Sequence, residues 1–343
     1  MIGLANDAEL ATTSGVIALV NLRAQIDGLE SQAAAGRLAP AQRASLIDLL
    51  ILGGHVLGRI ADYERAAALA EQLVHDAPAD DIAFLARART RATFHRFAAA
   101  LADLDAAERL GSDRAGLDAE RAAIFQALGR YDDALAFRRN AAESRPDFAT
   151  LGALAGLQAE RGEVAEAERL FAEGQRRYQD VSPFPVVLLD FQRGLMWLEQ
   201  GDLHAARVWF DAAQCRVPAY APALGHLAEV DAALGQREAA ISRLRPLTVS
   251  SDDPDYAAQL ASLLSEDGQA QEARQWRTRA AARYDELMVR HPAAFADNAA
   301  EFWLTAGADV SRALQLARQN LATRQTRRAY ALLQRAELAS YGG

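Results

Sequence analysis

The sequence contains no lysine, so arginine supplies all 37 of its basic residues, and 46 aspartates and glutamates outnumber them. The formal net charge is therefore −9. Proteins that bind nucleic acid carry a surplus of positive charge, because they must neutralise phosphates. We therefore expect no nucleic acid among the partners of this chain.

Cysteine and long apolar runs are also scarce. The single cysteine, Cys215, excludes an intramolecular disulfide, and we expect it to be a small buried side chain. Near the N-terminus the only apolar run covers residues 16–20, which is too short for a signal-peptide core or a membrane span. We expect no membrane insertion, and a cytoplasmic location unless an export signal was removed from a longer precursor.

The sequence also lacks the motifs of common enzymes and cofactor sites. Its six histidines are scattered, and no HExxH, GxSxG or paired His/Cys spacing occurs. The glycine-rich stretch LGGHVLG at 52–58 resembles a phosphate loop only in isolation, because no strand precedes it. We therefore expect a non-catalytic protein without metal or cofactor.

What the chain has in abundance is alanine, with 78 residues, or about 23% of the sequence. This content indicates closely packed helices, and the alanines recur with a period. The clearest copy of the repeat is LGRYDDALAFRRNAAESRP at 128–146. Alanines that would lie at a helix crossing follow one another at spacings of 33 to 40 residues. They are Ala66, Ala100, Ala134, Ala167, Ala206, Ala240, Ala273 and Ala313.

A second small residue precedes each of these alanines, by twelve residues for the first seven and by thirteen for the eighth. The set consists of Gly54, Ala88, Ala122, Ala155, Gly194, Ala228, Ala261 and Ala300. Small residues at two places in every period indicate two helices in contact there. The pattern resembles the tetratricopeptide repeat (TPR), a helix-turn-helix unit of 34 residues with small residues at positions 8 and 20. The aromatic corner Tyr131 and the closing prolines Pro78, Pro146 and Pro218 fit the same family.

The resemblance implies an all-α, right-handed superhelix of about eight helix pairs at 47–326, in which each repeat contacts only its neighbours. The repeats would begin at Ile47, Asp81, Ala115, Phe148, Val187, Ala221, Pro254 and Ala293. We expect an N-terminal helical extension at 1–46 and a C-terminal capping helix and tail at 327–343. Two stretches break the period: 179–186, where prolines predict a surface loop, and 283–294, where a lengthened second helix would end near Pro292.

Charged residues occupy first-helix positions that the family fills with apolar side chains. These are Asp118 and Arg121 in the third repeat and Asp190 and Arg193 in the fifth. Each pair has an i, i+3 spacing, so an internal ion pair could satisfy both groups. The alternative is that the four side chains contact a ligand.

First helices line the concave groove of a TPR superhelix, so the resemblance implies recognition of a protein or peptide there. The lysine and asparagine clamp of chaperone-tail binders is missing. Candidate groove residues are basic in the early repeats and acidic later, which predicts a charge gradient along the groove. They are His55, Arg59, Arg89, Glu120, Gln126, Glu160, Gln192, Glu199, His226, Glu229, Gln259 and Glu266.

Three functions therefore remain open. The first is a non-catalytic scaffold that binds a protein or peptide in the groove. The second is a ligand-switched regulator that closes on a small peptide, which the charged pairs at 118/121 and 190/193 would suit. The third is an accessory subunit of an enzyme system.

Overall fold

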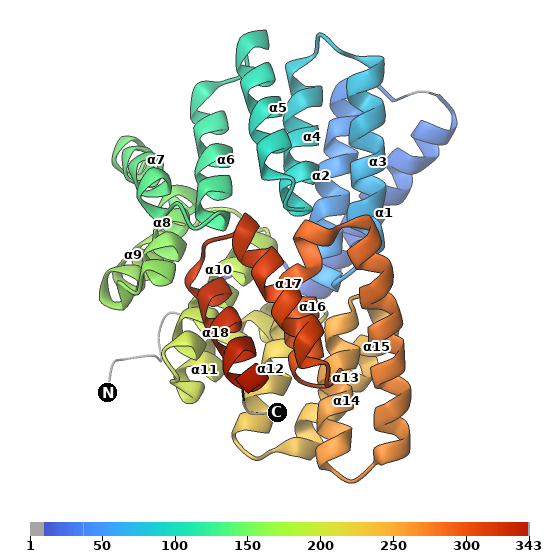
Figure 1. Ribbon diagram of the computed structural model, residues 1–343. Coiled ribbons are helices and arrows are strands. Elements are labelled where there is room, and N and C mark those ends of the chain that lie inside the picture. Colours follow the sequence, from blue (N-terminus) through green and yellow to red (C-terminus); the bar gives the residue numbers. More distant parts are fainter. Residues whose placement is uncertain (1–9, 37, 342–343) are drawn as a thin grey trace.

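The computed structural model describes residues 10–36 and 38–341, and these residues form 18 α-helices and no strand. The all-α solenoid expected from the sequence is confirmed (Figure 1). Helix α1 (Gly15–Ala34) precedes eight helix pairs, and α18 (Arg327–Tyr341) follows them.

The helix pairs follow the sequence repeat. In chain order they are α2 (Pro40–Leu57) with α3 (Ile60–Asp76), α4 (Asp81–Thr93) with α5 (Phe97–Leu110), α6 (Arg114–Ala127) with α7 (Tyr131–Ser144), α8 (Phe148–Arg161) with α9 (Val164–Arg176), α10 (Pro183–Glu199) with α11 (Leu203–Arg216), α12 (Ala221–Ala233) with α13 (Arg237–Ser250), α14 (Pro254–Glu266) with α15 (Ala270–Arg290), and α16 (Pro292–Leu304) with α17 (Val310–Thr323). The first helix thus begins at Pro40, ahead of the expected repeat start at Ile47.

Small residues hold the two helices of each pair together. All eight alanines of the crossing set are at most 6% exposed, and the eight small residues that precede them are buried as well. A larger side chain has no room at such a crossing. A Cβ on Gly194, for example, would lie 2.5 Å from the ring of Phe210 on the partner helix. The many alanines of the sequence are therefore explained by the close packing of helices, which leaves room only for small side chains at the crossings.

The two irregular stretches have different outcomes. The long second helix at 283–294 is present, because α15 runs to Arg290 and α16 begins at Pro292. In the stretch 179–186, residues 179–182 form the expected surface loop, but 183–186 are helical: Pro183 and Pro185 lie in the first turn of α10, where a backbone N–H has no partner within the helix. Phe184 packs against the apolar cluster that α1, α2 and α10 share. Cys215 is another correction, since its side chain is exposed on α11.

The superhelix closes on itself, so the expectation that each repeat contacts only its neighbours is wrong. Asp252, between α13 and α14, accepts hydrogen bonds from the backbone N–H groups of Ile60 and Ala61 at 2.6 and 3.1 Å. This carboxylate caps the start of α3 from a repeat 192 residues away in sequence. A shared apolar cluster, including Leu22, Val56 and Tyr220, joins α1 and α2 to α10–α12.

A second closure involves the end of the chain. Helices α16–α18 return to the middle of the molecule in Figure 1. Glu64 on α3 pairs with Arg290 at 2.6 Å and with His291 at 3.0 Å. The ring of His291 stacks on Phe94 with 3.9 Å between centroids. The junction between the seventh and eighth repeats is therefore packed against the first and second.

Candidate functional site

The early first helices carry the basic side chains, and hydrogen bonds within the chain satisfy them. Arg89 on α4 contacts Glu120 at 2.7 Å and Asp48 at 2.9 Å. Two candidate groove residues, Arg89 and Glu120, thus bind each other. On the same helix Arg87 and Arg91 share the buried carboxylate of Asp103, at 2.7 and 2.9 Å. These arginines stabilise the helix pair and leave little free positive charge.

His55 and Arg59 are used in the closure of the superhelix. The Nε2 atom of His55 lies 2.9 Å from the hydroxyl of Tyr220 on the far side of the closure. Burial lowers the pKa of His55 to about 4, so the imidazole is neutral at pH 7. Arg59 donates to the carbonyl oxygen of Ser250 at 3.3 Å. The N-terminal end is therefore less basic than the sequence alone indicates.

The first helices of the later repeats carry carboxylates that form no ion pair with an arginine among the described residues. Glu160 on α8 accepts a hydrogen bond from Gln126 at 2.7 Å and also bonds with the Tyr131 hydroxyl. Glu199 on α10 makes no hydrogen bond or ion pair with any residue that the structure describes. Burial raises the pKa of both carboxyl groups, and arginines near the C-terminus counteract it.

The next two repeats continue this pattern. Glu229 on α12 is paired with His226 of the same helix at 2.8 Å. Burial works against the charge of Glu229, but the hydrogen bond from His226 and its charge outweigh it and lower the pKa. Asp255 on α14 accepts from Gln259 at 2.8 Å, and burial raises its pKa. We call Glu160, Glu199, Glu229 and Asp255 the inner carboxylates.

An arginine-rich segment near the C-terminus faces the inner carboxylates. This arginine segment, residues 324–328, joins α17 to α18. Arg324 lowers the pKa of Glu160, Arg327 and Arg328 lower that of Glu199, and Arg328 also acts on Glu229 and Asp255. The side chains of Arg327 and Arg328 are exposed and form no ion pair within the described part of the chain.

Backbone contacts fix the position of the arginine segment on the third and fourth repeats. The N–H of Gln325 donates to Leu128 at 2.9 Å, and Arg324 donates to the carbonyl oxygen of Ala127 at 3.1 Å. A Cβ on Gly129 would lie 2.2 Å from the carbonyl oxygen of Gln325. A Cβ on Gly162 would lie 2.5 Å from Nη1 of Arg327. Both glycines also have positive φ, which disfavours a larger residue at each turn; at Gly129 the backbone of Gln325 excludes one as well, whereas the Arg327 side chain beside Gly162 can move aside.

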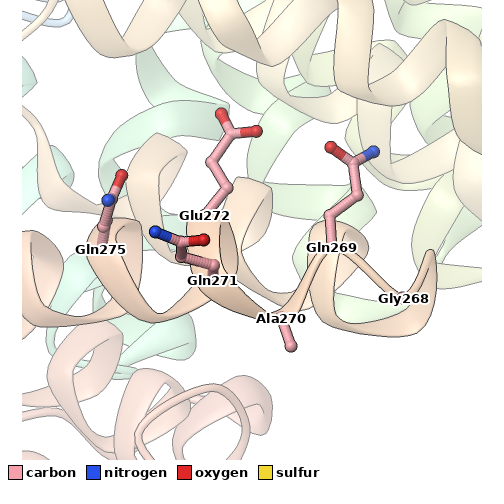
Figure 2. Close-up of a pocket in the computed structure, with 6 residues that line it drawn as sticks. All are labelled: Gly268, Gln269, Ala270, Gln271, Glu272 and Gln275. Atoms are coloured by element: carbon pink, nitrogen blue, oxygen red, sulfur yellow. The ribbon is translucent and has the colours of Figure 1, made fainter.

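The remaining candidate residues lie apart from this cluster. Gln192 is exposed on α10 beside Gly156. Glu266 lies 3.5 Å from Arg237 and lines a hollow of about 610 Å³ between α14, α15 and the turn before α17. A second hollow, of about 410 Å³, lies at the start of α15. Figure 2 shows residues that line it, among them Gln269, Gln271, Glu272 and Gln275. Glu272 is held there by Arg245 and Trp276.

The charged pairs of the third and fifth repeats have different partners. Arg121 contacts Asp118 at 3.3 Å, and it also reaches Asp105 at 2.9 Å and Glu108 at 2.6 Å on α5. The expected pair between Asp190 and Arg193 is not formed, because each residue binds a second helix instead.

Asp190 on α10 lies 3.2 Å from Arg216 of α11. Burial raises the pKa of Asp190 to about 6, although Arg216 opposes the shift. Arg193 donates to Glu168 at 2.8 Å and covers the ring of Trp209, 3.7 Å from its centroid. Charges that the sequence offered as ligand contacts are thus paired between neighbouring helices, although Oδ1 of Asp190 and Nη1 of Arg193 are buried without a hydrogen-bond partner among the described residues.

Sequence reasoning missed three members of the central cluster: Asp255, Arg327 and Arg328. The three arginines in RQTRR at 324–328 were a visible signal, but a capping helix explained them. Asp255 stands at the start of a helix, where an acidic residue is expected for local reasons. Neither the arginines at 324–328 nor Asp255 indicate, from the sequence alone, that they lie near repeats that are distant in the chain.

Two kinds of site are not found among the described residues. No group of three or more histidine, cysteine, aspartate or glutamate side chains there could hold a metal ion. Of the helices described above, none is long and apolar enough to cross a membrane.

Comparison with known proteins supports the fold. No family model and no curated protein sequence matches this chain. Among solved structures, human IFIT1 in a dimer with PPP-AAAA has a TM-score of 0.56 and 17% identity, covering 89% of this chain and 73% of that one. A chain of the APC/C hetero-tetramer Cut9–Hcn1 has a TM-score of 0.50 and 16% identity, and the match covers 92% of this chain and 59% of that one.

A tetratricopeptide repeat protein from Parabacteroides merdae ATCC 43184 is a third, more distant neighbour, with a TM-score of 0.44 and 16% identity over 74% of this chain and 97% of that one. At these identities the likeness concerns the fold. The eight helix pairs, their buried small residues and the IFIT1 and Cut9–Hcn1 matches identify the fold of this chain as a TPR-like α-solenoid.

Proposed function

We propose that this protein is a non-catalytic scaffold that binds a protein or peptide segment along the first helices of its repeats. The observation that carries the proposal is the set of inner carboxylates. They come from the first helices of four consecutive repeats, α8, α10, α12 and α14. In the described residues none of the four lies within 4.0 Å of an arginine side chain nitrogen.

The inner carboxylates differ from the buried acids of the described chain in having no arginine partner, although Glu160, Glu229 and Asp255 accept hydrogen bonds from neutral side chains or from histidine. Buried acids elsewhere are paired: Asp103 with two arginines, and Asp231 with Arg207 and Arg243. Glu199 and Glu229 are exposed to solvent, so their charges are accessible, and a ligand of opposite charge could pair with them. The same residues offer no nucleophile with an adjacent base, so binding without chemistry fits them better than catalysis.

The two other functions considered from the sequence have less support. A regulator that closes on a small peptide would need the charged pairs at 118/121 and 190/193 to be free, whereas they are bound within the chain. An accessory subunit of an enzyme system would use the same binding surface. We do not propose nucleic acid as the partner, because the inner carboxylates would repel phosphates.

Selection of peptides from a random library on the immobilised protein tests the proposal. Peptides that bind the native chain should lose affinity for the Glu229→Arg variant and keep it for Glu238→Arg. Glu238 is a matched control, an exposed glutamate on α13 without a hydrogen bond or ion pair to the described residues. A library that yields no binder, or binders that tolerate Glu229→Arg, would contradict the proposal. Binding of PPP-AAAA with micromolar affinity would favour a nucleic-acid function instead.

A further inference from the structure

The hollow of about 610 Å³ between α14 and α15 owes its third wall to an irregular turn of the next repeat. The turn between α16 and α17 has five residues, 305–309, whereas the turns inside the other seven helix pairs have two or three. This extra length is the reason why Ala313 follows Ala300 by thirteen residues. Seven pairs close with shorter turns, so the helix pair itself does not require the longer one.

The backbone of this turn is strained where it lines the hollow. Ala308 has a left-handed conformation, with φ of 53°, which among the described non-glycine residues only His95 shares. The turn of the preceding repeat places Gly268 in that region instead, with φ of 78°. A Cβ there costs free energy, yet the methyl group of Ala308 forms part of the wall. Strain of this kind is common at binding sites.

Two rows of hydrogen-bond donors line the hollow from the other sides. Ser262 and Ser265 lie one helical turn apart on α14, and Arg274 and Arg277 have the same spacing on α15. Ser262 and Arg274 each directly follow the small residue at which the two helices cross. The hydroxyl row and the guanidinium row therefore begin beside the closest approach of α14 and α15.

None of these four side chains forms a hydrogen bond or ion pair with a residue that the structure describes. Elsewhere such groups are satisfied within the chain. Ser45 and Thr278 donate to the carbonyl oxygen four residues earlier, at 3.0 and 2.9 Å. Arg283, further along α15, pairs with Asp252 and Glu286. The donors of the hollow are thus available to a ligand.

The chemistry of the lining selects an anion. Among the described residues that line the hollow, Glu266 is the only acid, and Arg237 of α13 lies 3.5 Å from it. Two guanidinium groups balance the charge of one phosphate monoester, and hydroxyl groups can donate to its remaining oxygens. The hollow is larger than a phosphate, and five alanines line the rest of it. It therefore suits a phosphate carried by a chain with small or apolar side chains.

We propose that this hollow binds the phosphate of a phosphorylated protein segment, with Arg274 and Arg277 pairing with the phosphate and Ser262 and Ser265 donating to it. This site goes beyond the proposed function, because none of its residues is an inner carboxylate. Asp255, the inner carboxylate of α14, lies about 15 Å along the helix from Ser265. A nucleic acid would bring a row of phosphates to a chain of net charge −9, whereas a protein segment brings one.

Fluorescence anisotropy with a labelled alanine peptide that carries one central phosphoserine tests the proposal. The native chain should bind it more tightly than the same peptide with serine, by roughly tenfold or more. The double substitution Arg274→Gln/Arg277→Gln should remove that preference. Its matched control, Arg109→Gln/Arg139→Gln, removes the same charge from exposed arginines without an ion pair to the described residues. The control should leave the affinity unchanged.

The double substitution Ser262→Ala/Ser265→Ala should weaken binding of the phosphopeptide by roughly threefold to tenfold, because two hydrogen bonds are lost. All four altered side chains of the hollow are at least partly exposed, so the fold should survive, which circular dichroism would check. Equal affinity for the two peptides, or equal losses in the arginine variant and its control, would overturn the proposal. Inorganic phosphate that competes at the same concentration as the peptide would also overturn it, as would tighter binding of a 5′-phosphorylated tetra-adenylate.

Discussion

The arginines of helix α4 form ion pairs within the chain, whereas the inner carboxylates, on the first helices of the fourth to seventh repeats, have no arginine partner among the described residues. On α4, Arg87, Arg89 and Arg91 each have a carboxylate within 3.1 Å. On α8, α10, α12 and α14 the inner carboxylates have no arginine at that distance among the described residues. The difference shows that a charged residue at a groove position is available to a partner only if the chain has not already paired it.

The largest expected effect comes from removing the acid that holds two arginines of α4. Asp103→Ala should reduce the free energy of unfolding by about 3 kcal/mol, because Arg87 and Arg91 would lose their shared, buried partner. Glu199→Ala should change it by less than about 0.5 kcal/mol, since no ion pair is lost. Urea denaturation of both variants measures the contrast, and equal losses would remove the distinction between the two regions.

Packing, unlike charge, should be the same in both regions. Ala100 in the second repeat and Ala167 in the fourth are both 0% exposed at helix crossings. Replacing either by leucine should overpack the crossing and cost roughly 1–3 kcal/mol. Ala136, which is exposed on α7, is the control and should tolerate leucine. Thermal melting of the three variants checks this, and a tolerated Ala167→Leu would show that the crossing is looser than the structure indicates.

The repeat was predictable because packing leaves a local trace in the sequence. Every helix crossing needs a small residue, so Ala134 and Gly194 recur at fixed places whatever the rest of the repeat contains. The contacts that close the superhelix follow no repeated pattern in the sequence. A capping carboxylate such as Asp252 looks like any loop acid, and its partner α3 lies in a distant repeat. Candidate groove residues were therefore identified by position, while their pairing depended on contacts that only the three-dimensional arrangement reveals.

The acidic region also predicts an unusual response to pH. Burial, with the nearby charge of Asp255, raises the pKa of Asp253 from 3.8 to about 7. An acid with a raised folded pKa destabilises the fold as the pH rises, so the native chain should lose stability between about pH 4 and pH 7. Asp253→Asn keeps the cap on the backbone N–H of Asp255 and removes the charge. At pH 8 it should be more stable than the native chain by about 1–2 kcal/mol, allowing for solvent screening.

Denaturation at pH 4 provides the control for this prediction. Aspartate is then largely protonated in the folded chain, and the difference between the variant and the native protein should shrink toward zero. A gain of the same size at both pH values would assign the effect to something other than the charge.

The smallest effect is expected for the partly exposed pairs of α4. Arg89 contacts Asp48 and Glu120, and its side chain is 36% exposed. Arg89→Ala should cost about 0.5–1 kcal/mol, less than the loss of Asp103, because water screens these pairs. Added salt should reduce the cost further. A loss as large as that of Asp103→Ala would mean that burial does not decide the strength of the α4 pairs.

The cap that Asp252 places on α3 has a mechanical consequence. Solenoids joined only through neighbouring repeats stretch like springs, and their ends fray one repeat at a time. Here a hydrogen-bonded bridge ties the first repeat to the junction of the sixth and seventh, and an apolar cluster ties it to the fifth and sixth. When force is applied to its two ends, the native chain should therefore resist extension and then unfold in one large step. The Asp252→Ala variant should instead extend gradually and at lower force.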